Sequence, residues 1–157
     1  MAKIKIGGVM KSPYLSEISV LGIPSRPGTA AAILGALGKN GINVQFIVQC
    51  LDENAQDHVV FCVNQDDFDA ALTIVDEVKG YVEASSVVSN PSVATISIFG
   101  PDFRERPAIA GTMFKALAAQ GINILAISTS ISTVSCVIDA DHLAQAVTSL
   151  TETFDLP

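Results

Sequence analysis

The sequence has no tryptophan, only two histidines and only three cysteines in its 157 residues. Cys50, Cys62 and Cys136 stand too far apart for a disulfide framework or a CxxC metal site. His58 and His142 have no cysteine or acidic residue at metal-ligand spacing. We therefore expect no metal and no cofactor, and we interpret Cys62 and Cys136, which have apolar neighbours, as small core residues.

Basic residues are also scarce. The chain has 9 Lys and Arg against 16 Asp and Glu, which gives a net charge of −7. Because a phosphate backbone is held mainly by clustered Lys and Arg, nucleic acid and anionic membranes are poor partners for this chain. No apolar run approaches the ~18 residues of a membrane span, and the first residues lack the layout of a signal peptide. We expect a cytoplasmic protein.

The chain does contain an internal repeat. Residues 36–49 read ALGKNGINVQFIVQ, residues 116–130 read ALAAQGINILAISTS, and the Gly-Ile-Asn triplet at 41–43 recurs at 121–123. A period of about 80 residues is too long for a solenoid and suits two copies of a small domain. We place the boundary near Asn90-Pro91-Ser92, a turn-like tripeptide.

Each copy has the same predicted order of elements. In the first copy the expected elements are a strand at 17–23, a helix with apolar positions from Ala30 to Leu37, strands at 43–51 and 58–63, a second helix beginning near Phe68, and a strand at 81–88. Gly41 suits the C-terminal cap of the first helix. This order is a ferredoxin-like βαββαβ unit, so we predict an α+β fold.

The second copy ends at Pro157 without its last strand. The segment Lys3–Ile6 alternates apolar and polar residues as a strand does, and an unfilled place in a small sheet would leave backbone groups uncovered. We therefore expect the N-terminal strand to complete the second sheet, with the first copy inserted in the second. The predicted domains are 15–90 and 3–14 plus 91–157.

The loop from Gly22 to Gly28 is the first candidate site. Gly28 lets a ligand or another backbone approach closely, and the free N–H groups near Gly28, Thr29 and Ala30 suit a small anion such as a carboxylate. The alternative is an ordinary capped helix start. In the second copy Ala108 stands in place of Gly28, and its Cβ would crowd a ligand, so the first site should be the better binder.

Polar residues near strand ends extend this site. Asn43 and Asn123 are expected to open the second strand of each copy, either holding a polar ligand group or bonding their own backbone at a turn. Asp52 is the acidic candidate for an ammonium group. Gln49 and Ser130 lie near strand ends, where the alternative for each of them and for Asp52 is solvated surface.

The whole pattern resembles a known family. The stretches ISVLGIPSRPGTAAAILGALGKNGINVQFIVQ and ISIFGPDFRERPAIAGTMFKALAAQGINILAISTS resemble the paired ACT domains of aspartate kinase, from about residue 4 to residue 154. The likeness is to the C-terminal regulatory region, which some bacteria also make as a separate regulatory (beta) subunit. In that family the first ACT domain is inserted in the second.

The resemblance implies a homodimer paired through ACT domains, with threonine or lysine bound at the interface. It implies effector-binding roles for Ser25, Gly28, Ala30, Gln49 and Val60 and, from the second domain of the partner chain, for Asn123, Ile124 and Ser130. It further implies a partnership with a catalytic kinase domain or subunit.

Three departures from the family pattern stand out. Ser25 replaces a frequent Asp whose charge helps to hold the effector's ammonium, which weakens the case for lysine and favours threonine. Ala108 replaces Gly, and Ile131 replaces a usual Glu. The family's catalytic domain and its glycine- and lysine-rich nucleotide site have no counterpart here, so we expect no enzyme activity from this chain alone.

Three functions follow from these expectations. The leading hypothesis is an amino-acid-binding allosteric regulator of aspartate kinase, which would serve feedback inhibition of the pathway to lysine, threonine and methionine. The alternative is a stand-alone ACT-domain sensor or assembly module that does not serve aspartate kinase. An acylphosphatase-type enzyme is the third, and it is the weakest because residues 102–106 supply arginines without a glycine-rich cradle.

Overall fold

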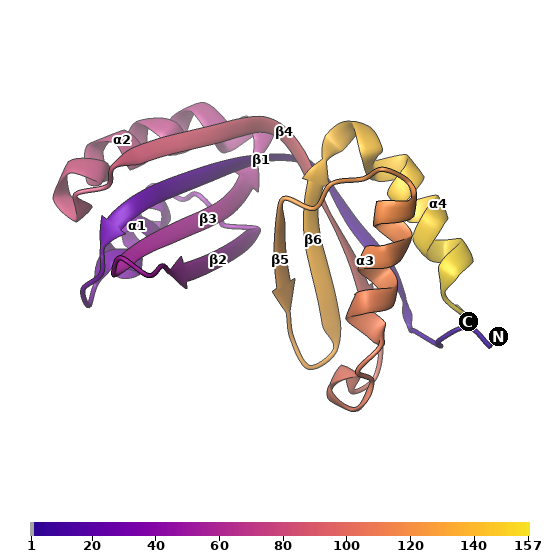
Figure 1. The fold of residues 1–157 in the computed structure, drawn as a ribbon. Coiled ribbons are helices and arrows are strands. Elements are labelled where there is room, and N and C mark those ends of the chain that lie inside the picture. Colours follow the sequence, from indigo (N-terminus) through magenta and orange to yellow (C-terminus); the bar gives the residue numbers. More distant parts are fainter. Residues whose placement is uncertain (1) are drawn as a thin grey trace. The chain divides into compact units, whose positions relative to one another are not determined.

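The computed structural model describes residues 2–157, which form two compact units. We call Tyr14–Ser92 the first unit, and the residues through Pro13 together with Val93–Pro157 the second unit. The first unit is one continuous stretch of chain, and the second is built from the two stretches that flank it (Figure 1).

The first unit has the predicted order strand, helix, strand, strand, helix, strand. Its elements are β1 (Gly8–Pro24, of which the part from Tyr14 belongs here), α1 (Thr29–Lys39), β2 (Phe46–Leu51), β3 (Gln56–Asn64), α2 (Phe68–Val82) and the first part of β4 (Ser86–Phe99). A short 3-10 turn, Gln65–Asp67, leads into α2.

Helix α1 shows why these residues fold as they do. Thr29, Ile33 and Leu37 are its buried residues, spaced four apart on one face. The helix ends where Gly41 takes a φ of 72°, and the Gly41 N–H donates to the carbonyl of Gly38 at 3.0 Å. Glycine adopts this left-handed conformation without steric cost, so the predicted cap at Gly41 is confirmed.

The core of the first unit lies between its helices and one face of its sheet. β1 and β2 both pair antiparallel with β3, with Ile18 and Ile47 each opposite Phe61. Because alternate residues of a strand share a face, this register places the apolar residues together. The buried members are Ile18, Val20, Ile23, Ile33, Leu37, Ile42, Val59, Phe61, Val63, Ala71, Ile74, Val75 and Val82.

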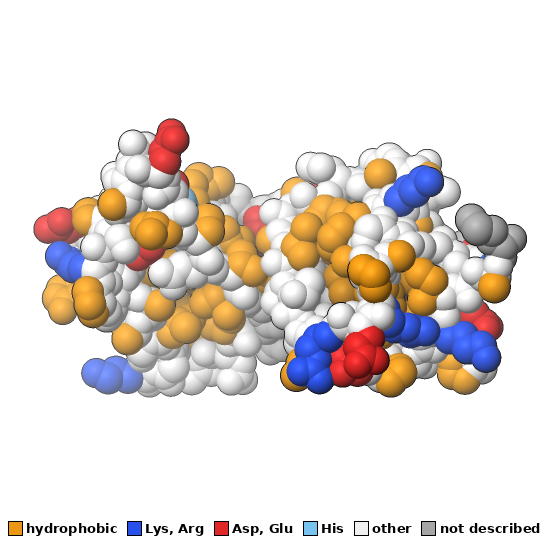
Figure 2. Space-filling model, turned by 60° about the horizontal axis from the view of Figure 1, so that its bottom comes forward, with side chains coloured by type: hydrophobic (Ala, Val, Ile, Leu, Met, Phe, Trp, Pro, Cys, Tyr) orange, Lys and Arg blue, Asp and Glu red, His pale blue; other side chains and the backbone are white. Residues whose placement is uncertain are grey.

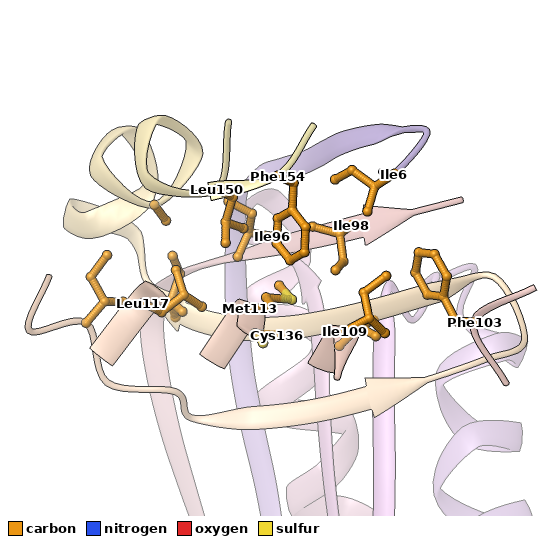
Figure 3. Packing of buried hydrophobic residues seen from close by; sticks show 14 residues of the cluster. Ile6, Ile96, Ile98, Phe103, Ile109, Met113, Leu117, Cys136, Leu150 and Phe154 are labelled. Atoms are coloured by element: carbon orange, nitrogen blue, oxygen red, sulfur yellow. The ribbon is translucent and has the colours of Figure 1, made fainter. Parts of the chain in front are cut away.

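The second unit repeats the plan. After β4 come α3 (Ile109–Ala119), β5 (Ala126–Thr129), β6 (Thr133–Asp139) and α4 (Leu143–Thr153), with 3-10 turns at Phe103–Glu105 and Ala140–His142. Its core packs α3 and α4 against β4 and β6, and Ile6 from the N-terminal stretch joins it (Figure 3). The strand order is β2-β3-β1-β4-β6-β5.

An N-terminal strand does complete the second sheet, as predicted, but it starts later than expected. β1 begins at Gly8 and is the neighbour of β4, and just before it the Gly7 N–H donates to the carbonyl of Phe99 at 2.7 Å. Lys3–Ile6 form no strand and make one isolated parallel bridge to Asp155. The alternation of Lys3–Ile6 therefore reflects packing of Ile6 into the core rather than a ladder.

Three local predictions are wrong. The strand expected at 81–88 begins only at Ser86, because α2 continues through Val82. Asn90-Pro91-Ser92 is no turn but extended strand within β4. Pro91 is tolerated because this part of β4 has a neighbour strand, β1, on one side only, whereas β6 pairs with β4 from Val93 onward. The second strands also begin later than Asn43 and Asn123, which lie exposed in the loops before β2 and β5.

None of the helices within residues 2–157 is long and apolar enough to cross a bilayer.

Candidate functional site

The loop that joins β1 to α1 is open to solvent. All four residues from Ser25 to Gly28 are exposed, and Gly28 caps the helix with a φ of 95°. Its carbonyl accepts the Ala32 N–H at 2.9 Å, while no side chain of the described residues caps the helix start. The N–H groups of Thr29 and Ala30, together with the positive end of the helix dipole, therefore suit a small anion such as a carboxylate.

Gly28 is required for a reason other than the one expected. A Cβ added there would meet no atom of the chain within 4 Å, so close approach of the chain's own backbone does not explain it. Its φ of 95° lies in the left-handed region that residues with a side chain rarely adopt. The glycine sets the conformation of the helix start, and the space beside it is free.

A bulge in β1 shapes the beginning of this loop. The pairing of β1 with β3 shifts between Val20 and Ile23, and Gly22 lies in the bulge with a φ of 66°. Its N–H donates to Nδ1 of His58 at 3.1 Å, and its carbonyl accepts from Oγ of Ser85 at 3.0 Å. Both backbone groups of Gly22 thus have partners, the N–H in a side chain and the carbonyl in the side chain and backbone N–H of Ser85.

The imidazole of His58 is held between two partners. Its Nε2 lies 2.8 Å from Oδ2 of Asp52, while its Nδ1 accepts from Gly22. Since Nδ1 is an acceptor, the ring proton in this arrangement sits on Nε2 and is donated to Asp52. This chain of hydrogen bonds ties the β2–β3 turn to the bulge.

Asp52 is fully engaged in this turn. Its Oδ1 accepts the N–H of Asn54 at 2.8 Å and of Gln56 at 3.1 Å, and its Oδ2 faces His58. The hydrogen bond from His58, followed by that from the Gln56 N–H, holds the pKa of Asp52 below its usual range. Both oxygens already have partners, so an ammonium group at Asp52 would share this carboxylate with His58 and two backbone N–H groups.

Ser25 and Arg26 anchor the loop and leave its outer side free. The Ser25 N–H donates to the carbonyl of Ala55 in the β2–β3 turn at 3.0 Å. Nη2 of Arg26 donates to the carbonyl of Tyr81 at 2.6 Å, with the guanidinium 6.0 Å from the centre of the Tyr81 ring. The exposed Ser25 side chain remains beside the helix start.

The register separates two of the other predicted residues. Gln49 lies opposite the core residue Val59, whereas Val60 lies opposite Val48 on the other face of the sheet. Gln49 therefore points to the face that carries the helices, and Val60 to the opposite face.

The second-unit residues are divided by β5. Asn123 is exposed and Ile124 half-buried in the loop before β5, while Ser130 follows its last residue. Oγ of Ser130 lies 2.6 Å from Oγ1 of Thr133 and accepts the Thr133 N–H at 3.1 Å, so this side chain shapes the β5–β6 turn. Asn123 and Ile124 therefore stand together, and Ser130 stands at the other end of the strand.

The corresponding loop of the second unit is filled. Phe103 is 7% exposed, its N–H donates to the carbonyl of Ile131 at 2.7 Å, and its ring points into the core near Ile109 (Figure 3). Ala108 begins α3 with an ordinary helical φ of −85°. The loop differs from the first because an aromatic side chain packs inside it, and not because of the Ala108 Cβ alone.

Sequence reasoning misses three residues of this geometry. The expectations drawn from the sequence give His58 no role, include no bulge at Gly22 and assign no core position to Phe103. A glycine inside a strand pattern indicates a bulge, so the bulge at Gly22 was predictable from the sequence. The role of His58 depends on long-range register, which no local pattern carries.

Cys62 and Cys136 behave as expected of core residues, whereas Cys50 is exposed. Cys62 and Cys136 are fully buried, and burial raises the pKa of each thiol to about 12. For Cys62 the negative charge of Glu17, its partner across the strands, adds to this rise. Residues 2–157 contain no group of three or more His, Cys, Asp or Glu side chains that could hold a metal ion.

Comparisons with known proteins agree with this architecture. A family model described as ACT domain matches residues 18–78 and 96–154. An aspartate kinase of Pseudomonas fluorescens is 34% identical over 151 residues, which cover 96% of this chain and 37% of that protein. The chain thus spans little more than a third of the length of such curated relatives.

Two solved structures match nearly end to end. The regulatory subunit of aspartate kinase from Thermus thermophilus, in a ligand-free form, superposes with a TM-score of 0.86 at 29% identity, covering 96% of this chain and 99% of that one. A chain from a structure of aspartokinase alpha and beta subunits has a TM-score of 0.85 at 31% identity, covering 94% and 97%.

Proposed function

The chain belongs to the ACT domain family and is similar over nearly its whole length to aspartate kinase regulatory regions, and from this we propose that it binds a free amino acid and thereby regulates an aspartate kinase. We favour threonine as the effector. The catalytic kinase domain or subunit is the partner of this proposal, and feedback control of the pathway to lysine, threonine and methionine is its purpose.

The open start of α1 is the observation that carries the proposal. Its first N–H groups have no side-chain cap, Gly28 leaves free space beside them, and the loop around them is exposed. An α-carboxylate is the anion that this geometry fits in both size and charge. In the second unit Phe103 packs into the core and Ala108 begins α3 with a helical φ, so we expect the first unit to be the better binder.

The side chains near this place favour a neutral effector. Ser25 offers a hydroxyl, and the Asp52 carboxylate is taken by His58 and two backbone N–H groups. A lysine side chain would need a carboxylate to hold its second ammonium group. The hydroxyl of threonine instead has Ser25 and the amide of Gln49 as hydrogen-bonding candidates.

The other half of the site is expected from a partner chain. β2 and β5 are the two ends of the strand order, so each presents an unpaired edge. Leu125 is 39% and Ile127 42% exposed on and beside β5, next to Asn123, and Figure 2 shows hydrophobic side chains reaching the surface of each unit. Pairing of two chains along such edges would cover these residues and bring the partner's Asn123 and Ile124 to the effector.

Regulation requires only that the effector bind two states of the kinase unequally. An amino acid that prefers one arrangement of paired ACT units shifts the population toward it by its difference in affinity. A few hydrogen bonds to charged groups, each worth about 1–3 kcal/mol, match sensing in the micromolar to millimolar range.

Titration calorimetry of the chain with threonine, lysine, methionine and isoleucine tests the proposal. We expect heat from threonine with the wild type and its loss with Gly28→Ala. Gly41→Ala is the matched control, because Gly41 also has a positive φ and open space around it but lies at the other end of α1. Absence of heat from all four amino acids would overturn the proposal, and light scattering with threonine would test the dimer.

A further inference from the structure

His58 belongs to none of the groups that the proposed effector would touch, yet it is bonded to the beginning of the effector loop. The bulge of β1 turns the Gly22 N–H out of the ladder, and Nδ1 of His58 accepts it at 3.1 Å. The side chain of His58 is 24% exposed, so this bond is partly shielded from water. An unpaired N–H in such a place costs free energy comparable to a lost hydrogen bond.

The second unit shows that an imidazole is not needed merely to close such a loop. There the N–H of Gly100, which follows β4 as the loop begins, donates to the backbone carbonyl of Ser132 at 3.0 Å. A backbone acceptor keeps its hydrogen bond at every pH. In the first unit the acceptor is instead Nδ1 of His58, which can be protonated, and it lies beside the open loop.

We propose that His58, oriented by Asp52, is a positioning residue for the effector loop, and that only its Nε2-protonated neutral form holds the loop in the binding conformation. This inference takes its ligand from the proposed function, whereas the hydrogen bonds of His58 do not depend on that function. A proton on Nδ1 would face the Gly22 N–H with a second donor, so the bond to the bulge would be lost. Imidazoles gain this proton between about pH 8 and pH 5.

The charged and titratable groups around His58 are few. Asp52 faces it from the β2–β3 turn, and Cys50 is its register partner on β2. Asp57 precedes it on β3 and is opposite Leu51 and Ile23, on the other face. On the β1 side it meets the Gly22 N–H, which carries no titratable group.

Two substitutions at one position separate positioning from simple packing. His58→Asn places an amide oxygen near the position of Nδ1, so it keeps an acceptor for Gly22 but cannot titrate in this range. His58→Leu removes the acceptor and keeps an apolar side chain. His142→Asn, the other histidine of the chain, is the matched control.

Amide exchange of the ligand-free chain, measured residue by residue by NMR and expressed as protection factors, is the first readout. In the wild type we expect the protection factor of the Gly22 amide to fall about tenfold from pH 8 to pH 5. In His58→Asn the Gly22 amide should stay protected at both pH values, and in His58→Leu it should lack this protection already at pH 8. Equal Gly22 protection in wild type and His58→Leu, or the same loss on acidification in wild type and His58→Asn, would overturn the proposal.

Threonine calorimetry at the same pH values is the second readout. We expect wild-type affinity to fall about five- to tenfold on acidification, and that of His58→Asn to stay within about twofold. An equal fall in both proteins would overturn the positioning role. If the amide protection follows the expected pattern but threonine gives no heat at any pH, the proposed function fails while His58 remains the residue that positions the loop.

Discussion

The two units start their first helices in opposite ways. In the first, the loop from Ser25 to Gly28 is exposed and leads into α1 through a left-handed glycine. In the second, the longer loop folds into a 3-10 turn whose Phe103 joins the core, and Ala108 leads into α3 in a helical conformation. The two units thus share a framework but differ in the backbone conformation of the helix start and in the packing of the loop before it.

The largest effect should come from emptying the filled loop. Phe103→Ala removes a 7% exposed ring from the second core, and we expect the free energy of unfolding to fall by about 3 kcal/mol because of lost burial and the cavity. Ser25→Ala, in the exposed loop, should change it by less than about 0.5 kcal/mol. Urea denaturation measures both, and a cost below about 1 kcal/mol for Phe103→Ala would contradict the contrast between the loops.

Exchanging Gly28 and Ala108 should show that the two helix starts differ in backbone conformation and not in the room for a side chain. Gly28→Ala forces a side chain into a φ of 95° and should cost about 1 kcal/mol although no atom clashes. Ala108→Gly changes an exposed cap position and should alter stability by less than about 0.5 kcal/mol without creating a second threonine site. A neutral Gly28→Ala, by thermal denaturation, would show that the loop adapts freely.

A third test concerns one strand position at which the repeats differ. Glu17 corresponds to Thr95, and Oε2 of Glu17 is buried without a hydrogen-bond partner among the described residues. Burial raises the pKa of Glu17 above 4.5, so the native state holds this proton more tightly than the unfolded chain does. Stability attributable to Glu17 is therefore full below pH 4.5 and falls as the pH rises through the raised value.

Glu17→Gln should remove this dependence and stabilise the chain at pH 7 by about 1 kcal/mol, because the buried charge is gone. Denaturation at pH 4 and pH 7 is the measurement, and the variant's advantage should shrink at pH 4. An advantage that is equal at both pH values would mean that packing, and not ionisation, separates the two residues.

The smallest effect is expected from the acidic residue of the filled loop. Asp102 accepts from the side chain and the backbone N–H of Arg104, which lower its pKa below 3.8. A lowered pKa contributes stability above 3.8 that is lost as the pH falls through the native value. Asp102→Asn should therefore shift the midpoint of acid unfolding only slightly, since the pair is exposed to solvent. The control Asn54→Ala should not shift this midpoint.

Much of this fold could be predicted from the sequence because it depends on periodicity. The spacing of Ile33 and Leu37 identified α1, Gly41 its end, and the repeated triplet the duplication. The missing strand of the second copy was enough to predict that the N-terminus would supply it. Each of these signals is local or is a comparison of the chain with itself.

The rest of the site depends on pairings between distant segments. That Gln49 and Val60 face opposite ways follows from the register of β2 with β3, and that Asp52 is occupied follows from His58 and from the turn. Phe103 lies in a 3-10 turn before α3, and no periodic spacing of apolar residues predicts this turn. Such positions are set by tertiary packing, which overrides local preference.

The nesting of one unit within the other has a consequence for synthesis on the ribosome. The first unit is contiguous, so it has all of its residues once Ser92 has emerged. The second is complete only after α4 and Asp155 have been synthesised, because the Ile6 N–H donates to the carbonyl of Asp155 at 3.0 Å. The first unit is therefore fully synthesised first. Its folding shortens the flexible loop that must close when the two segments of the second unit come together.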